Sequence, residues 1–147
     1  MDFPYVVAPI AGYLLAGVTK FIINSFKYKK LAFDEIGMGN MPSTHNTITS
    51  SIFFTLGFGE GFFSPICGVG LALMLVVSID SLDLRKKIEG HAKIIFKEFS
   101  HKNSEAALLR LKLSHSIPEV LGGIALGAII GYTLIELLPL VESLFEI

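Results

Sequence analysis

The run FFSPICGVGLALMLVVSI at residues 62–79 carries no charge and decides the class of fold. A helix of about 20 apolar residues crosses the hydrocarbon core of a bilayer. Three other runs are also uncharged or nearly so: residues 3–19, 46–59, and 117–141, where only Glu119 and Glu136 interrupt. The sequence therefore predicts an all-α membrane protein with about four transmembrane helices, near residues 3–25, 44–59, 62–79 and 117–140.

Composition supports a single integral membrane domain over residues 1–147. Hydrophobic residues make up 52% of the 147 residues and charged residues 17%, whereas a soluble domain carries about 25% charge. The mean hydropathy is +0.63. This apolar content excludes disordered, collagenous and coiled-coil proteins, and the single cysteine, Cys67, excludes a disulfide scaffold.

Charge is distributed unevenly, although the net charge is only −1. All twelve basic residues fall in two loops on one side of a four-helix arrangement: Lys20, Lys27, Lys29 and Lys30, then Arg85, Lys86, Lys87, Lys93, Lys97, Lys102, Arg110 and Lys112. The opposite side holds only acidic charges. The positive-inside rule then predicts cytoplasmic basic loops, including residues 80–116, and both termini outside. For a bacterial source, the membrane would be the inner (plasma) membrane.

The loop at 80–116 is the one polar region and contains an amphipathic pattern. Leu84, Ile88, Ile95 and Phe99 recur at helical spacing. This predicts a cytoplasmic amphipathic helical segment, broken near residues 100–104, that lies at the membrane interface or packs against a partner.

Four glycines share one face of the last predicted helix. They are Gly122, Gly123, Gly127 and Gly131. Small residues at this spacing are typical of close helix packing in membranes. The thin four-helix bundle that results is also compatible with a homodimer, for which the same face could serve.

Two polar constellations open helices at the basic ends. The first is GNMPSTHNT at residues 39–47, where Ser43 or Thr44 is a candidate N-cap and His45 falls in the first turn. The unpaired N–H groups and dipole of such a helix start favour an anion. The second is HSIPE at residues 115–119, in which Ser116 and Glu119 form a capping-box pattern beside His115.

Each histidine alone is readily explained as a surface or capping residue, and Lys20 as a lysine that snorkels to the interface. Together they fit phosphate chemistry. One histidine can attack phosphorus, a second can protonate the leaving oxygen, and cations can stabilise the equatorial oxygens. A carboxylate at Glu119 could hold the tautomer of His115.

At these residues the chain resembles the type 2 phosphatidic acid phosphatases (PAP2), which are related to vanadium haloperoxidases. The PSTH at residues 42–45 is similar to their PSGH-type motif, and His115, Glu119 and Gly123 are similar to their third motif. The order of segments resembles the small divergent PAP2 branch more closely. The matching pieces are Lys20, residues 39–45, Asp80 with Arg85, and residues 114–123.

This resemblance implies a PAP2-like helical bundle and a metal-independent hydrolase that forms a phosphohistidine. His115 would be the nucleophile, Glu119 its orienting acid and His45 the general acid. The implied phosphate-binding residues are Lys20, Ser43, Thr44, Lys27, and either Arg85 or Arg110 as the cation that replaces a missing Ser-Arg; the implied supporting residues are Asp80 and Asn40. No metal, cofactor or nucleic-acid partner is implied.

The expected function is phosphatase activity on a membrane lipid phosphate, with a phosphoric monoester or pyrophosphate as the bond cleaved. Candidate substrates are phosphatidic acid, phosphatidylglycerophosphate and a polyprenyl (pyro)phosphate. The sequence departs from the family pattern, since Thr44 replaces glycine and Glu119 replaces aspartate. These departures favour an alternative, a non-catalytic lipid-phosphate-binding protein or complex subunit that retains the pocket. The third hypothesis is a purely structural membrane protein.

Overall fold

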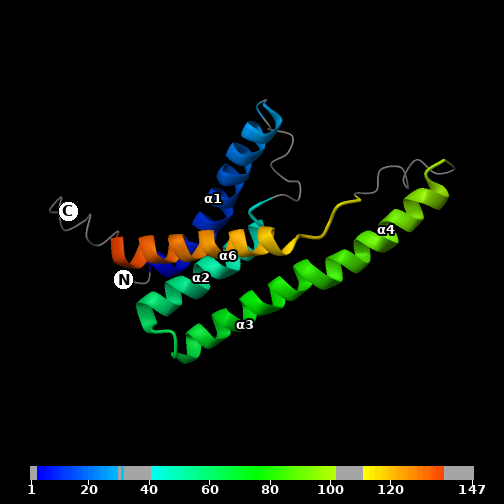
Figure 1. The fold of residues 1–147 in the computed structure, drawn as a ribbon. Helices are drawn as coiled ribbons and strands as arrows, with labels where there is room; N and C mark the ends of the chain where they lie inside the picture. The colour runs from blue at the N-terminus through cyan, green and yellow to red at the C-terminus, as the bar shows by residue number, and fades with distance from the viewer. Residues whose placement is uncertain (1–2, 30, 32–40, 102–110, 138–147) are drawn as a thin grey trace.

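The computed structural model describes residues 3–29, 31, 41–101 and 111–137 of the chain. These residues form helices and connecting segments without a strand, which confirms the all-α prediction. Figure 1 shows their arrangement. The helices are α1 (Phe3–Tyr28), α2 (Thr44–Glu60), α3 (Pro65–Ile79), the π-helix η2 (Asp80–Leu84), α4 (Arg85–Phe99), α6 (Ile117–Tyr132) and the π-helix η3 (Thr133–Leu137).

Three helical stretches are long and apolar enough to cross a membrane. They are Phe3–Tyr28, Pro65–Phe99 and Ile117–Leu137. Their large apolar side chains point outward in many places, for example at Val6, Leu73 and Leu121. Apolar groups exposed over such an extent need a solvent that is itself apolar. The fold is therefore consistent with an integral membrane protein.

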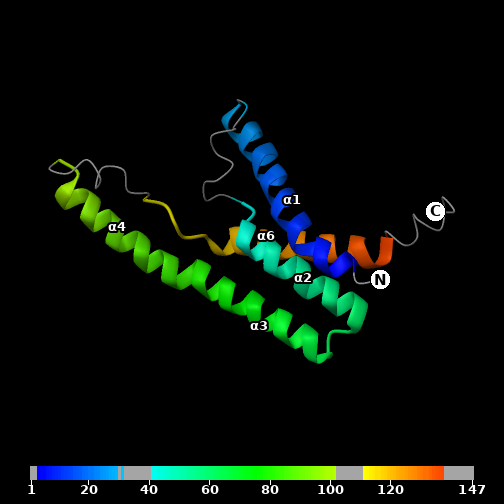
Figure 2. The same ribbon diagram turned by 180° about the vertical axis from the view of Figure 1, so that it is seen from behind.

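The predicted span at 44–59 is the helix α2, but it is not among those three stretches. It has 17 residues and lies at the centre of the bundle, in contact with α1, α3 and α6. Seen from behind, it passes between α1, α6 and the long α3–α4 helix (Figure 2). Because its buried residues are mainly Ser, Thr and Asn, its mean hydropathy is lower than that of its neighbours. A fourth full span stays a prediction.

The hydroxyls of α2 are satisfied inside the bundle. Ser51 Oγ donates to Ala8 O of α1 at 2.9 Å, and Ser50 Oγ donates to Gly123 O of α6 at 3.2 Å. Thr55 Oγ1 donates to a carbonyl of its own helix, Ser51 O, at 2.7 Å. Each bond satisfies a group that lipid could not. The polar interior therefore links α2 to the helices on both sides of it.

Close packing of α6 on α2 runs through the predicted glycine face. A Cβ on Gly127 would meet Ser50 Oγ and, at 2.6 Å, Ser51 N. Gly123 and Gly131 face α2 backbone atoms in the same way, whereas Gly122 would meet only the flexible side chain of Met41. Close packing is confirmed at three of the four glycines by contact with the α2 backbone.

The predicted end of the third helix at residue 79 is wrong. The helix continues through η2 into α4 and ends at Phe99, which makes one helix of 35 residues. Figure 1 shows it as a single long rod. Residues 80–84 contain neither Gly nor Pro, so the polarity of the chain changes there without a helix breaker. The predicted amphipathic segment is thus the continuation of a helix that is apolar enough to cross a membrane. Its cytoplasmic position stays a prediction.

Other boundaries follow the predictions within a turn. The helix predicted at 3–25 extends to Tyr28. The predicted break after Phe99 is present, with Ser100 as the C-cap. The last helix passes into η3 and is described as far as Leu137, so residues 138–140 lie outside the described ranges. Residues 111–116 are not helical and lead directly into α6.

Candidate functional site

His115 stands on a short non-helical segment that the long α3–α4 helix holds in place. Its backbone N donates to Ser81 O of η2 at 3.2 Å. Just ahead of it, the backbone N atoms of Leu113 and Ser114 both donate to Glu89 Oε2 at 3.1 Å, and Ser114 Oγ donates to the same oxygen at 2.6 Å. One carboxylate therefore fixes the segment that carries His115.

The imidazole of His115 is paired with Glu119. His115 Nδ1 lies 3.1 Å from Glu119 Oε2, which also accepts the backbone N–H of Ser116 at 2.9 Å. The predicted capping box is present at this helix start. When Nδ1 carries the proton and donates it to the carboxylate, Nε2 keeps a lone pair. Glu119 thus caps α6 and sets the tautomer of His115 with the same oxygen.

Burial keeps His115 neutral. Its side chain is only 6% exposed. Desolvation lowers the pKa of the imidazole from its ordinary value of 6.5, and the positive charges of Lys20 and Arg85 lower it further, whereas the bond and charge of Glu119 oppose the shift. A lowered pKa leaves His115 unprotonated near neutral pH, the form in which a histidine can act as a nucleophile.

The second histidine stands on the first turn of α2, which is joined to α6 by its backbone. Ser43 N donates to Glu119 O at 2.9 Å. Lys20, a buried residue of α1, donates from Nζ to Thr44 Oγ1 at 3.2 Å. The next residue, His45, is exposed. The structure therefore brings the starts of α2 and α6 and the lysine of α1 together.

Three charged side chains also act on the second histidine. Burial lowers the pKa of His45 from its ordinary value of 6.5, and the positive charges of Arg85 and Lys20 lower it further, whereas the charge of Asp80 opposes the shift. Arg85 Nε donates to Asp80 Oδ2 at 2.6 Å, so these two residues of the resemblance form an ion pair. Sequence left open whether Arg85 or Arg110 is the cation of this cluster. The structure brings Arg85 to it from α4, and Arg110 lies outside the described residues.

The remaining predicted residues are placed differently. Ser43 is fully buried, and its Oγ accepts a hydrogen bond from Asn46 Nδ2 at 2.9 Å. Lys27 is exposed, with its Nζ 5.3 Å from the centre of the Tyr28 ring rather than in this cluster. Asn40 lies outside the described residues. The structure thus gives Ser43 an internal partner and Lys27 a surface position.

Sequence reasoning missed a buried polar network beneath the site. Asn46 Nδ2 also donates to Ser81 Oγ at 3.3 Å, and its Oδ1 accepts from Ser78 Oγ at 2.6 Å. This network fixes α2 against the α3–α4 helix at the level of the histidines. An asparagine inside an otherwise apolar segment is a signal that could have indicated it. Glu89 carried no such signal, because it lies among other charged residues.

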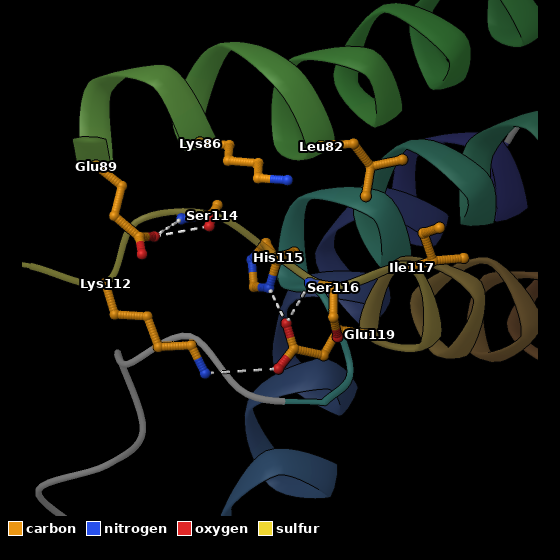
Figure 3. Close-up of a pocket in the computed structure, with 9 residues that line it drawn as sticks. All are labelled: Leu82, Lys86, Glu89, Lys112, Ser114, His115, Ser116, Ile117 and Glu119. Atoms are coloured by element: carbon orange, nitrogen blue, oxygen red, sulfur yellow. Dashed lines mark hydrogen bonds and ion pairs between the residues drawn. The ribbon is translucent and has the colours of Figure 1, made fainter. Parts of the chain in front are cut away.

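A cleft of about 520 Å³ opens beside His115 and Glu119 (Figure 3). Its walls combine basic and apolar side chains from α4, from the segment before α6 and from α6 itself, among them Lys86, Lys112 and Ile117. Within the described part of the chain, no three His, Cys, Asp or Glu residues gather as a metal site requires. The site therefore offers a buried imidazole with a carboxylate behind it, a second imidazole and several cations.

Comparison with known proteins places this arrangement in a family. A family model described as the divergent PAP2 family matches residues 2–130. The chain belongs to the divergent PAP2 family. The match contains both histidine segments of this divergent PAP2 protein as well as Lys20, Asp80 and Arg85. No curated protein and no solved structure matches the chain.

Proposed function

We propose that this divergent PAP2 protein is a membrane phosphatase that hydrolyses a lipid phosphate through a phosphohistidine. The observation that carries the proposal is the His115–Glu119 pair, in which Nδ1 lies 3.1 Å from Oε2 beside a second histidine and buried Lys20. A capping or structural role does not require cations from two helices, Lys20 of α1 and Arg85 of α4, to act on both imidazoles.

The proposed reaction begins when His115 Nε2 attacks phosphorus. An N–P bond forms as the bond from phosphorus to the lipid oxygen breaks, and protonated His45 gives its proton to that oxygen. Neutral His45 then takes a proton from water, which attacks the phosphohistidine and releases inorganic phosphate with His115 restored. Lys20 and Arg85 would stabilise the charge on the phosphoryl oxygens during both steps.

Position in the membrane belongs to the same proposal. The basic residues of α4 and of the segment before α6 would face the cytoplasm of a bacterial inner membrane. A lipid headgroup would then reach His115 at the cytoplasmic interface, while its chains stay among the outward-facing apolar side chains. Phosphatidic acid, phosphatidylglycerophosphate and polyprenyl (pyro)phosphates all meet this requirement.

The test is phosphate release by the purified protein in detergent with EDTA, from a panel of lipid phosphates. His115→Ala should lose activity by roughly 10⁴-fold or more because no other group replaces the nucleophile. His91→Ala is the matched control, since His91 is an exposed histidine of α4, and it should keep wild-type activity. Rapid quenching of wild type with a ³²P-labelled substrate should trap a phosphoprotein that is stable to base and labile to acid.

Two results would overturn the proposal. One is the absence of release from every lipid by wild type. The other is equal release from wild type and His115→Ala. A protein without turnover that still bound lipid phosphate would instead be a non-catalytic binder.

A further inference from the structure

Two lysines line the cleft beside His115 that the proposed reaction does not use. Lys86 of α4 and Lys112 of the segment before α6 line it on opposite sides, in addition to the site cations Lys20 and Arg85 (Figure 3). The two lysines come from elements far apart in sequence. Their shared cleft points to an anion that lies between them.

Lys86 is the more informative of the two lysines. It is exposed, and it makes no hydrogen bond or ion pair with the described residues. The next residue, Lys87, differs in both respects, because its Nζ lies 2.8 Å from Asp83 Oδ2 and it does not line the cleft. An ammonium group carries three N–H donors. Lys86 can therefore offer its donors to a ligand in the cleft.

Lys112 is only loosely engaged with the acid that orients His115. Its Nζ lies 3.7 Å from Glu119 Oε1, and 59% of its side chain is exposed. That distance is longer than a charge-assisted hydrogen bond, which is about 2.7–2.9 Å. Lys112 therefore lines the cleft without a short bond to Glu119.

The two carboxylates of the cleft are occupied by donors of their own. Glu89 accepts from Lys93 Nζ at 2.6 Å as well as from the Ser114 hydroxyl at 2.6 Å. Glu119 accepts from His115 and the Ser116 backbone. These bonds hold the carboxylates in place and partly offset their charge, so Lys86 is the side chain of the cleft best able to bind an anion.

We propose that this cleft is a subsite for a second anionic group of the substrate, next to the phosphate that His115 attacks. The inference rests on the proposed function. It selects lipids with two phosphate groups, such as a lipid diphosphate, over lipids with a single phosphate. Apolar Leu82 and Ile117 also line the cleft, and Ile117 begins α6, so the lipid chain can leave the subsite along a membrane helix.

The test compares two substrates that differ by one phosphate, farnesyl diphosphate and farnesyl monophosphate. Wild type should show a kcat/KM for the diphosphate that is at least roughly tenfold higher, because one additional charge-assisted contact is worth about that factor. Lys86→Gln should remove most of this preference while it changes kcat/KM for the monophosphate less than about threefold. Lys87→Gln, the matched control, should leave the preference intact.

Two kinetic results would overturn the inference. Wild type could show equal kcat/KM for the two substrates. Lys86→Gln could lower both values by the same factor, which would mean that Lys86 serves the scissile phosphate or the fold.

A binding experiment separates this inference from the proposed function. Wild type is titrated with farnesyl methylenediphosphonate and with farnesyl phosphonate, neither of which can be hydrolysed. Tighter binding of the diphosphonate that Lys86→Gln abolishes supports the subsite even if no substrate is turned over. Equal binding of both compounds overturns it even if the protein is an active phosphatase. Inorganic methylenediphosphonate, as a third arm, shows whether the anion must be part of a lipid.

Discussion

His115 and His45 both stand beside the N-terminus of a helix, but the protein holds them differently. The His115 side chain is 6% exposed, its ring is bonded to Glu119, and its backbone is bonded to Ser81. His45 is exposed on the first turn of α2, and its ring makes no hydrogen bond with the described residues. His115 is held through both its ring and its backbone, whereas His45 is held only through its backbone.

This difference matches the two roles proposed for the histidines. A nucleophile must approach phosphorus along one line, so its ring gains from a fixed orientation. The general acid exchanges protons first with the leaving oxygen and then with the water that takes its place, and neither step forms a bond between its imidazole and phosphorus. The comparison teaches that the more firmly held histidine is the one that would bond to phosphorus in the proposed reaction.

After loss of His115 itself, the largest effect is expected from Glu119→Gln, which leaves the ring of His115 without its charged partner. Glutamine can still accept the backbone N–H of Ser116, so α6 should keep its cap. We expect kcat to fall by roughly 10²- to 10⁴-fold, as for acids that orient a catalytic histidine. Phosphate release measures the loss, and Glu136→Gln in η3 is the control. A loss below threefold would mean that Glu119 only caps the helix.

His45→Ala should show an effect that depends on the leaving group. Removal of a general acid costs roughly 10²- to 10⁴-fold when the leaving oxygen is a poor one, as in a lipid alcohol. An aryl phosphate with an acidic phenol needs less help and should lose far less. His115→Ala should abolish both reactions equally. Equal losses in His45→Ala for the two substrates would contradict its role as the acid.

A smaller effect is expected from Glu89→Gln, which weakens the hold on the segment before His115. The glutamine amide can accept only some of the three hydrogen bonds that Glu89 Oε2 accepts, and it carries no charge. We expect kcat to fall roughly tenfold, with a smaller change in KM, since bonds to a charged acceptor are worth about 1.5–3 kcal/mol. Glu98→Gln, an exposed neighbour on α4, is the control. An unchanged kcat would show that the segment holds its position without Glu89.

The smallest effect is a shift in the pH profile. Because burial lowers the pKa of His115 below 6.5, its neutral form should persist as pH falls through 6.5, and the acid limb of kcat/KM should lie below that value. Glu119→Gln removes the bond and the charge that oppose the shift, so the residual acid limb should move further down. The same shift makes the unfolding free energy lower below pH 6.5 than above it. An acid limb above 6.5 in wild type would contradict the assignment.

Sequence predicted the parts of the site that depend on local patterns. The capping box at Ser116 and Glu119 is visible within a few residues, and so is the spacing of Asp80 and Arg85. Sequence could not predict that Glu89 holds a segment 24 residues away, because nothing local distinguishes it from other charged residues of α4. It also could not separate Gly122 from Gly127, since only the packed helices show which glycine meets backbone and which meets the side chain of Met41.

The same limit explains the main error in the fold. A change from apolar to charged residues at Asp80 was interpreted as the end of a helix, although polarity does not break a helix by itself. Residues 80–84 and the predicted amphipathic helix as far as Phe99 are in fact one helical continuation of α3. The π-helix η2 (Asp80–Leu84) is the only irregularity that the structure describes along this long helix.

Because α3, η2 and α4 form one continuous helix, its length indicates how deep in a membrane the site would lie. Twenty residues separate Pro65 from Arg85, which corresponds to about 30 Å at 1.5 Å per residue. The hydrocarbon core of a bilayer is about 30 Å thick. With Pro65 at one edge of the hydrocarbon and the helix along the membrane normal, Arg85 would reach the other edge, where the headgroup region begins. The length of this single helix therefore sets the depth in the bilayer at which the protein would meet its substrate.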